Sequence, residues 1–289
     1  MPIVIFGAGG QVGKQLVRDL SKKYEVFGFT RKECDISNDD EVQKVLDKIK
    51  PSIVINAAAY TDVDGSEDNT IEANLINFKA VNNLAILSNL LNFVLIHFST
   101  DYVFNHSSNN PIKENDILNP INAYGKSKLR GENSILSNTK TFYILRISWV
   151  YGEHGKNFPK TIINLAKSKS EIKIINNQYG SPTPTSLVSS AVSKIIEFHF
   201  RNIHKFGIFH LAPEKCCSWF DIGRIIHKRI KNNPKYILKK VIPISSKEYN
   251  SAAKRPAFSY LDNTKIKKSF DIKIQEWEKY LLDFLVKYE

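Results

Sequence analysis

The chain has 289 residues, 42% of them hydrophobic, which is enough for a real core in one large domain or two ordinary ones, and no apolar run approaches the roughly 18 residues that span a bilayer. The net charge of +12 comes from scattered lysines without a helix-turn-helix, zinc-finger or aromatic RNA-binding pattern, so we expect no nucleic-acid partner. Cys34, Cys216 and Cys217 suit neither a disulfide framework nor a metal knuckle, and the first residues predict a strand rather than a signal peptide, so we expect a cytoplasmic protein.

The first half of the chain alternates between short apolar runs and segments in which apolar residues recur at helical spacing. The runs predicted as strands are Ile3–Phe6, Tyr24–Phe29, Ser52–Ile55, Phe93–Phe98 and Phe142–Ile147. The predicted helices are Gln11–Leu20, a segment from the N-cap Ser37 to Lys50-Pro51, about Thr70–Leu91, and Ala123–Leu136. Repeated strand–helix–strand units predict a doubly wound parallel sheet of the Rossmann type, with helices on both faces.

The pattern loosens after Trp149, which indicates a smaller C-terminal α/β domain. The strands predicted there are Ile172–Ile175 and Phe206–Leu211, and the helices are Ser186–Phe198, Phe220–Lys231 and Gln275–Lys287. We therefore divide the chain into a first domain over residues 1–149, to which part of 181–200 returns, and a second domain made mainly of residues 150–289.

A glycine-rich loop, Gly7-Ala8-Gly9-Gly10-Gln11-Val12-Gly13, lies between the first strand and the first helix. Glycines let the backbone approach a pyrophosphate closely, and the helix N-terminus offers free N–H groups to the anion. The position and spacing of the glycines predict a dinucleotide site of the short-chain dehydrogenase kind.

The end of the second strand carries Arg31 and Lys32 where an acidic residue would bind the ribose 2′-hydroxyl of NAD. Arg31 could pair with a 2′-phosphate, which favours NADPH and leaves NADH possible, although a plain basic surface pair would look the same. Asp35 and Ile36 follow and are expected to flank the adenine.

Tyr124 and Lys128 stand four residues apart on a predicted helix and therefore on one face. A nearby ammonium lowers the pKa of a tyrosine, so this pair predicts an effective proton donor. Thr100 lies where the fourth strand ends, the edge at which doubly wound sheets bind ligands, and is placed to hydrogen-bond a carbonyl oxygen.

Several further segments join these motifs in a fixed order. They are Asn56-Ala57-Ala58-Ala59-Tyr60-Thr61, Ser99-Thr100-Asp101-Tyr102-Val103-Phe104, Ser148-Trp149-Val150-Tyr151-Gly152, Asn157-Phe158, Gln178-Tyr179-Gly180 and Arg255-Pro256. With these segments the chain resembles the dTDP-4-dehydrorhamnose reductase family, within the extended short-chain dehydrogenases, over nearly its whole length.

The resemblance implies hydride transfer from a nicotinamide to C4 of dTDP-4-dehydro-β-L-rhamnose, giving dTDP-L-rhamnose. It implies that Tyr124 donates the proton, that Lys128 lowers the pKa of Tyr124 and binds the nicotinamide ribose, and that Thr100 orients the carbonyl. It implies cofactor contacts from the glycine loop, Tyr124, Lys128, Arg31, Asp35, Ile36, Ala57, Ala58 and Ala59. It also implies a nucleotide-sugar site in the cleft between the two domains, formed with Thr61, Val63, Asp101, Val103, Trp149, Asn157, Gln178 and Arg255.

Two departures from the family pattern bear on assembly and specificity. Some members form a metal-bridged dimer through a glutamate at the position of Gln15; an amide next to Lys14 is a poor ligand, so we expect no metal and a monomer or a homodimer that does not depend on one. Asp62 and Gly65 also differ from the residues that usually follow Tyr60-Thr61 in the family, which would be compatible with a different sugar preference.

Two other functions stay open on the sequence. One is reduction of another nucleotide-linked 4-keto-6-deoxy sugar. The other is a non-catalytic role like that of the regulatory subunit of methionine adenosyltransferase, which intact Thr100, Tyr124 and Lys128 argue against. His97 is interpreted as a packed core histidine, and Trp219 and Trp277 as packing residues.

Overall fold

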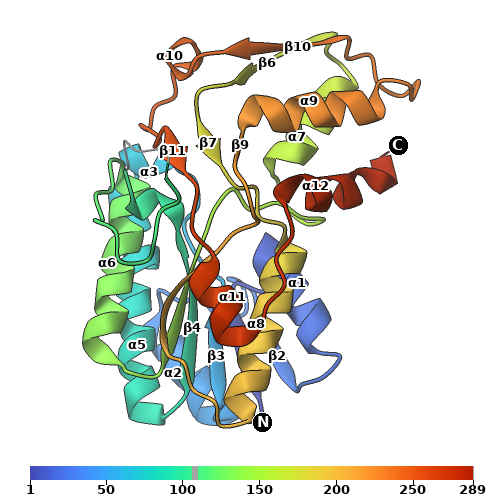
Figure 1. Ribbon diagram of the computed structural model, residues 1–289. Coiled ribbons are helices and arrows are strands. Elements are labelled where there is room, and N and C mark those ends of the chain that lie inside the picture. The colour runs from blue at the N-terminus through green and yellow to red at the C-terminus, as the bar shows by residue number, and fades with distance from the viewer. Residues whose placement is uncertain (106–109, 289) are drawn as a thin grey trace.

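A parallel β-sheet forms the centre of the molecule, which was analysed as a computed structural model describing residues 1–105 and 110–288 (Figure 1). In these residues its strand order is β2-β1-β3-β4-β5-β8. The strands are β1 (Ile3–Phe6), β2 (Val26–Phe29), β3 (Ile53–Asn56), β4 (Val94–Thr100), β5 (Phe142–Ile147) and β8 (Gly207–Leu211). Most of these strands are buried along their whole length, as expected for a sheet covered on both faces.

Helices cover both faces of the sheet, and each layer has its own core. One face carries α1 (Gln11–Leu20), α8 (Thr185–Phe200) and α11 (Thr264–Phe270). The other carries α2 (Asp39–Ile49), α5 (Ala80–Leu91) and α6 (Ala123–Asn138). The doubly wound Rossmann-type fold is confirmed.

The strand predicted at Phe206–Leu211 does not belong to the second domain. It forms β8, which pairs in parallel with β5 at the edge of the central sheet. The helix α11, still later in the chain, contributes Ile266 and Phe270 to the same core. The C-terminal half therefore returns to the sheet more extensively than the sequence suggested, because strand pairing is decided by non-local contacts.

Two local details also differ from the predictions. The second helix is capped by Asn38, whose side chain accepts from the backbone N–H of Glu41, rather than by Ser37. The segment predicted as one helix from Thr70 to Leu91 is helical but contains a π-helical stretch, η1 (Leu75–Lys79), between α4 (Thr70–Asn74) and α5.

A smaller part of the molecule lies beyond the carboxyl ends of the central strands (top of Figure 1). Its strands are β6 (Glu171–Ile175) paired with β10 (Lys240–Ile244), and the short β7 (Tyr179–Gly180), β9 (Cys217–Ser218) and β11 (Phe258–Ser259). Its helices are α7 (Phe158–Ala166), α9 (Trp219–Ile230), α10 (Ser246–Tyr249) and α12 (Trp277–Leu285), and η3 (Val286–Tyr288) follows α12. The short α3 (Gly65–Asp68) and η2 (Asp101–Val103) lie after β3 and β4, respectively. A separate core includes Trp277, Leu281 and Leu285, the apolar stripe of the last helix.

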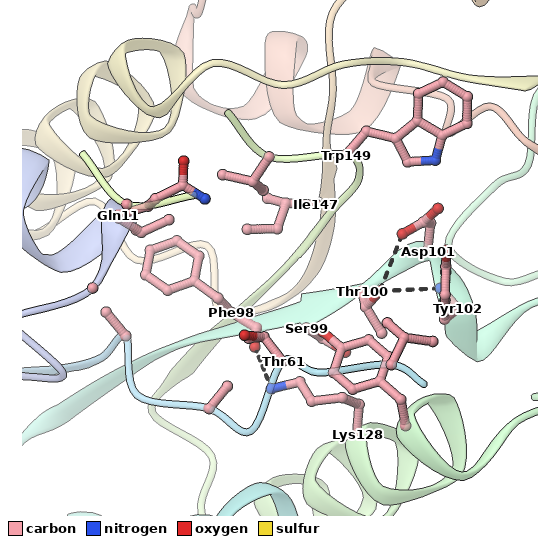
Figure 2. A pocket seen from close by; sticks show the side chains of 18 of the residues that line it. Gln11, Thr61, Phe98, Ser99, Thr100, Asp101, Tyr102, Lys128, Ile147 and Trp149 are labelled. Carbon is pink, nitrogen blue, oxygen red and sulfur yellow. Dashed lines mark hydrogen bonds between the residues drawn. The ribbon is translucent and has the colours of Figure 1, made fainter. Parts of the chain in front are cut away.

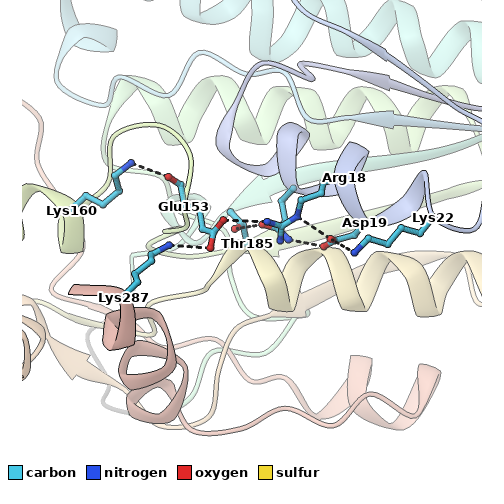
Figure 3. Close-up of polar contacts among 8 residues, drawn as sticks. Arg18, Asp19, Lys22, Glu153, Lys160, Thr185 and Lys287 are labelled. Atoms are coloured by element: carbon cyan, nitrogen blue, oxygen red, sulfur yellow. Dashed lines mark hydrogen bonds and ion pairs between the residues drawn. The ribbon is translucent and has the colours of Figure 1, made fainter. Parts of the chain in front are cut away.

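Salt bridges connect this part to the first helix (Figure 3). Glu153, in the segment after β5, is 3.2 Å from Arg18 on α1 and 3.0 Å from Lys287 near the C-terminus. Arg18 also contacts Asp19, which lies 3.7 Å from Lys22. All of these side chains are substantially exposed, so each pair contributes little alone, about 0–1 kcal/mol. None of the described helices has the length and apolar character needed to cross a membrane.

Candidate active site

A cavity of about 590 Å³ opens at the carboxyl ends of the central strands (Figure 2). The loops that follow β1, β3, β4 and β5 contribute to its wall, together with α6 and the first residue of α9. Among the predicted site residues, those that line it are Gly10, Gln11, Val12, Ala57, Ala59, Thr61, Val63, Thr100, Asp101, Tyr124, Lys128 and Trp149. The fold thus brings the glycine loop, Tyr124 and Lys128 to the same cavity.

The glycine loop has the backbone form that a pyrophosphate needs. Gly7 has a φ of 77°, and a Cβ there would collide with the backbone at Ala58. A Cβ on Gly13 would collide with the carbonyl oxygen of Gly7. The N-cap residue of α1 is Gly10, and no side chain caps the helix there. The free backbone N–H groups at the start of α1 therefore have no capping side chain as a partner. These features fit a dinucleotide.

A second cavity, of about 260 Å³, continues from the glycine loop toward the end of β2. It is lined by the predicted cofactor residues Gly7, Gly9, Gly10, Arg31, Asp35, Ile36, Ala57, Ala58 and Ala59, with Cys34 and Ile76. Arg31 is largely exposed and lies 2.9 Å from Asp35 and 3.4 Å from Glu72. Its guanidinium is therefore held at the rim by two carboxylates.

Thr100 and Tyr124 approach each other from different elements of the main cavity. The Thr100 hydroxyl donates to Asp101 at 3.0 Å and accepts from the backbone N–H of Tyr102 at 3.2 Å. The ring of Tyr102 packs edge-on against Tyr124, with centroids 5.8 Å apart. Thr100 is held at the strand end, and its hydrogen bond with Tyr124 is one of the influences on the pKa of that phenol.

The electrostatics of Tyr124 differ from the expectation. Desolvation raises its pKa, and the nearby Asp101 raises it further, while the hydrogen bond with Thr100 opposes both. The Lys128 Nζ donates to the carbonyl oxygen of Phe98 at 2.7 Å (Figure 2). The same nitrogen lies 3.1 Å from His97 Nε2. Helical spacing placed the two residues on one face, but the long lysine side chain runs to β4.

Asp101 is a buried carboxyl at the cavity wall. Burial raises its pKa to about 7, although hydrogen bonds with Ser259 and Thr100 act in the opposite direction. Ser99, next to it on β4, lines the same cavity and has a buried hydroxyl without a hydrogen-bond partner in the described residues. Both groups are available to polar atoms of a ligand.

Trp149 is held in an uncommon backbone conformation at the mouth of the cavity. Its φ is 47°, a left-handed value that costs a bulky residue about 1–3 kcal/mol. Its indole stacks on Trp219 with centroids 3.5 Å apart and an interplanar angle of 11°. A Cβ at Gly180 would collide with the Trp149 ring, so the backbone at Gly180 and the face of Trp219 together fix the indole.

Four of the predicted nucleotide-sugar residues are not among the described residues that line the main cavity. Val103 is fully buried in a small core with Phe104. Asn157 caps α7 and donates to Gln11, and Gln178 accepts from the indole N–H of Trp219 at 3.2 Å. These contacts place them behind the wall, where they support residues that do line it.

Arg255 is the fourth of these residues. Its guanidinium lies 2.7 Å from the carboxylate of Asp64 and hydrogen-bonds to the carbonyl oxygen of Ala253. Lys156, in the loop before α7, is among the described residues that line the cavity.

Comparison with known proteins agrees with this geometry. A family model described as RmlD substrate binding domain matches residues 1–289. The chain is 38% identical over 288 residues to dTDP-4-dehydrorhamnose reductase of Aggregatibacter actinomycetemcomitans, with 96% of each chain covered. A crystal structure of dTDP-4-dehydrorhamnose reductase from Bacillus anthracis in complex with NADP superposes with a TM-score of 0.92 at 34% identity, covering 99% of both chains. The chain belongs to the dTDP-4-dehydrorhamnose reductase family.

Membership in the dTDP-4-dehydrorhamnose reductase family confirms the resemblance seen in the sequence. Another relative, the spore coat polysaccharide biosynthesis protein SpsK of Bacillus subtilis, is 35% identical, with 98% of this chain and 96% of that protein covered. The chain therefore corresponds to nearly the full length of these proteins.

Gln15 occupies the position where the resemblance suggested a bridging glutamate. Its amide donates to Asp19 at 2.6 Å, and its carbonyl oxygen lies 3.4 Å from the Thr185 hydroxyl. Among the described residues no cluster of three or more His, Cys, Asp or Glu side chains is arranged to hold a metal.

Sequence reasoning missed several residues of this site. Trp219 and Lys156 line the cavity, and His97 contacts the amine of Lys128. His97 is buried as expected, but its ring nitrogens contact the polar side chains of Asn56 and Lys128. The available signal was a histidine inside an apolar strand, two residues before the Ser-Thr-Asp segment.

The two unusual residues near Thr61 form a local turn. The Asp62 carboxylate accepts from the backbone N–H of Gly65 at 2.9 Å, and a Cβ at position 65 would collide with that carboxylate. Asp62 and Gly65 are thus matched to each other, and neither is among the described residues that line the main cavity.

Proposed function

We propose that the protein reduces the C4 keto group of dTDP-4-dehydro-β-L-rhamnose to dTDP-L-rhamnose, with NADPH as the preferred cofactor and NADH as a second one. The observation that carries the proposal is the shared cavity in which Thr100, Tyr124 and Lys128 face the glycine loop. Family membership supplies the substrate class, and the NADP complex of the Bacillus anthracis relative supports the cofactor.

Tyr124 acts as the proton donor. Its raised pKa keeps the phenol protonated at neutral pH, which is the form that can give a proton to the oxygen at C4. Thr100, fixed by Asp101 and the N–H of Tyr102, orients that oxygen. The bound nicotinamide supplies the hydride, and Lys128 holds the ribose of that cofactor.

The remaining wall residues hold the nucleotide sugar between the central sheet and the part of the chain after residue 149. Thr61, Val63, Asp101 and Trp149 surround the sugar, and Val103, Asn157 and Gln178 support that wall from behind. We expect Lys156 to meet the diphosphate, because it lines the cavity, whereas Arg255 is paired with Asp64. We also propose a cytoplasmic enzyme, as a monomer or as a homodimer without a bridging metal.

The test is NADPH oxidation, followed by near-ultraviolet absorbance, with enzymatically generated dTDP-4-dehydro-β-L-rhamnose and identification of the product sugar. Formation of dTDP-L-rhamnose supports the proposal. Bound NADPH without turnover, or a product with the other configuration at C4, would contradict it and point to another nucleotide sugar.

The role of Lys156 predicts a defect in binding rather than in chemistry. Lys156→Ala should raise the KM for the nucleotide sugar about 10-fold, as expected for the loss of a charge-assisted hydrogen bond, with kcat little changed. Lys167→Ala, an exposed lysine outside the cavity, is the control. Equal KM values for the two variants would remove Lys156 from the diphosphate site.

A further inference from the structure

Asn157 joins the two parts of the molecule beside the glycine loop. It is the N-cap residue of α7 and is 9% exposed. Its side chain contacts Gln11, the first residue of α1, which lies 146 positions earlier in the chain, at 2.9 Å. Gln11 lines the main cavity, so this contact connects a residue behind the cavity wall to a residue on the wall.

The polar atoms of the Asn157 amide each have a partner that fixes the direction of the side chain. Its Oδ1 accepts from the backbone N–H of Lys160 at 3.1 Å, and that group can only donate. The Nδ2 group therefore points the other way. Its two hydrogens are donated to the carbonyl oxygen of Gly152 and to Gln11 Oε1, both at 2.9 Å.

The same reasoning fixes the amide of Gln11. Because Asn157 offers only a donor, Gln11 must turn its oxygen toward Asn157 and its NH₂ group away from it. Figure 2 shows the Gln11 nitrogen on the side of Ile147, another residue that lines the cavity. In the part of the chain that the structure describes, this NH₂ group donates to no protein acceptor, so it is available to a ligand.

The loop before α7 restrains the Gln11 side chain further. Gly155 has a φ of 69°, and a Cβ there would collide with Gln11 Cγ, so the loop backbone lies directly against this side chain. The Lys160 Nζ donates to the carbonyl oxygens of Glu153 and Gly155 at 3.0 Å and 2.9 Å, which holds the loop on α7.

The place of Gln11 indicates which part of a dinucleotide it meets. It is the first residue of α1, where free backbone N–H groups suit a pyrophosphate. It lines the main cavity with Tyr124 and Lys128 and is not among the described residues of the second cavity, where the adenine is expected. We propose that Asn157 is a positioning residue that holds the Gln11 NH₂ group toward the phosphate on the nicotinamide side of the cofactor.

This inference rests on the cofactor of the proposed function and not on its sugar. Asn157→Asp tests it, because aspartate caps a helix as well as asparagine does but its carboxylate cannot donate. The melting temperature should stay close to that of the wild type. Gln11 should turn its NH₂ group toward the carboxylate and its oxygen toward the cavity, where the oxygen opposes a phosphate.

The readout is the Kd for NADPH, measured by fluorescence titration of the full-length protein without sugar. Asn157→Asp should raise this Kd about 10-fold, as expected for the loss of a hydrogen bond to a charged group. Asn164→Asp is the matched control, because it adds the same charge at an exposed position of the same helix. A wild-type Kd for Asn157→Asp would overturn the proposal.

A second ligand separates positioning from general damage to the cavity. Adenosine 2′,5′-bisphosphate carries the adenine end of NADPH and lacks the nicotinamide and its phosphate. Its Kd should be the same in Asn157→Asp as in the wild type. An equal rise for both ligands would mean that Asn157 only maintains the wall, which overturns the proposal.

Gln11→Met shows whether Asn157 acts through Gln11. Methionine keeps the length of the side chain and removes the amide, so the Kd for NADPH should rise about 10-fold in this variant as well. Adding Asn157→Asp to Gln11→Met should raise the Kd less than about twofold further, because the two changes remove the same interaction.

Two outcomes of this cycle count against the proposal. The full effect of Asn157→Asp in the Gln11→Met background would mean that the added charge acts directly on the cofactor. Wild-type binding of NADPH by Gln11→Met would leave Gln11 without the phosphate contact, and that result stands even if Asn157→Asp does not fold. Because no titration contains the sugar, a failure of the proposed reductase activity would not be mistaken for a failure here.

Discussion

Tyr124 lies at the cavity wall with its phenol near Thr100 and Asp101, and burial raises its pKa. Replacing it with phenylalanine keeps the ring that packs against Tyr102 and removes only the proton donor. Tyr124→Phe should therefore lower kcat at least about 100-fold in the NADPH oxidation assay, while NADPH still binds.

The matched control is Tyr151→Phe, which removes a fully buried hydroxyl that has no hydrogen-bond partner in the described part of the chain. Its activity should stay close to that of the wild type. Turnover of Tyr124→Phe at the level of the control would exclude Tyr124 as the acid.

Asp101 predicts a dependence of stability on pH. The pKa of this buried carboxyl is raised from 3.8 to about 7, so the unfolded chain loses the proton at lower pH than the folded one. Between about pH 4 and about pH 7 the folded state holds more protons, and its stability falls as pH rises; above about pH 7 the loss is complete.

Asp101→Asn cannot ionise and should lack this effect. Urea unfolding gives the free energy of unfolding of both proteins at about pH 5 and about pH 8. From the lower to the higher pH, the stability of the variant relative to the wild type should increase by roughly 2–3 kcal/mol. A stability difference independent of pH would mean that Asp101 is ionised throughout, with an ordinary pKa.

Arg31 predicts the cofactor preference. Its guanidinium stands at the rim of the second cavity, where a ribose 2′-phosphate could compete with Asp35 and Glu72 for it. Arg31→Ala should raise the KM for NADPH more than that for NADH, because only NADPH carries the phosphate. Lys32→Ala, one residue further along, is the control. If Arg31→Ala raised the KM for NADPH and the KM for NADH equally, Arg31 would not bind the 2′-phosphate.

At the scale of elements, a buried ion pair joins α6 to β5. Arg146 and Glu132 are each 1% exposed and form three contacts of 2.6–3.2 Å, and Arg146 also donates to the carbonyl oxygen of Glu114. Arg146→Met would leave the Glu132 charge buried and unpaired, which should lower the free energy of unfolding by about 3–5 kcal/mol.

The control for this prediction is Lys240→Met, because Lys240 and its partner Glu171 are both mostly exposed. That variant should change the free energy of unfolding by less than about 1 kcal/mol in the same denaturant series. Similar decreases in the free energy of unfolding for the two variants would mean that the buried ion pair stabilises the fold no more than the exposed one.

The elements of the first half were predictable because their signals are local. The apolar runs, the glycine loop and the helix spacing each depend on neighbouring residues, and the strands and helices lie within a few residues of the predictions. Pairing partners are not local, so nothing near Phe206–Leu211 indicated that it lies beside β5.

The same distinction holds for the site. Thr100, Tyr124 and the glycine loop follow from their positions at strand and helix ends, whereas the direction of a long or aromatic side chain depends on what packs around it. The turn of Lys128 toward His97, and the stacking of Trp219 on Trp149, come from elements distant in sequence. The raised pKa of Tyr124 follows mainly from its burial, which likewise depends on the packing of distant elements and could not be predicted from the sequence.

At the scale of the whole molecule, the chain crosses several times between the central sheet and the smaller part. The segment 1–149 holds the glycine loop and the Tyr–Lys pair but lacks β8, α8 and α11, which complete the sheet and one of its cores. Expressed alone, it should show no cooperative thermal transition by circular dichroism. Coexpression with 150–289 should restore a transition and NADPH binding; a stably folded 1–149 would show that the later segments are dispensable.

The packing of α1 against α8 also has a consequence for the synthesis of the chain. The glycine loop and α1 leave the ribosome well before α8, the helix that covers α1, and β8, the strand that closes the sheet edge. During translation the nascent sheet therefore presents an unpaired β5 edge and an uncovered apolar face. The helix that follows the glycine loop is therefore covered by its partner helix only after Phe200 has been made.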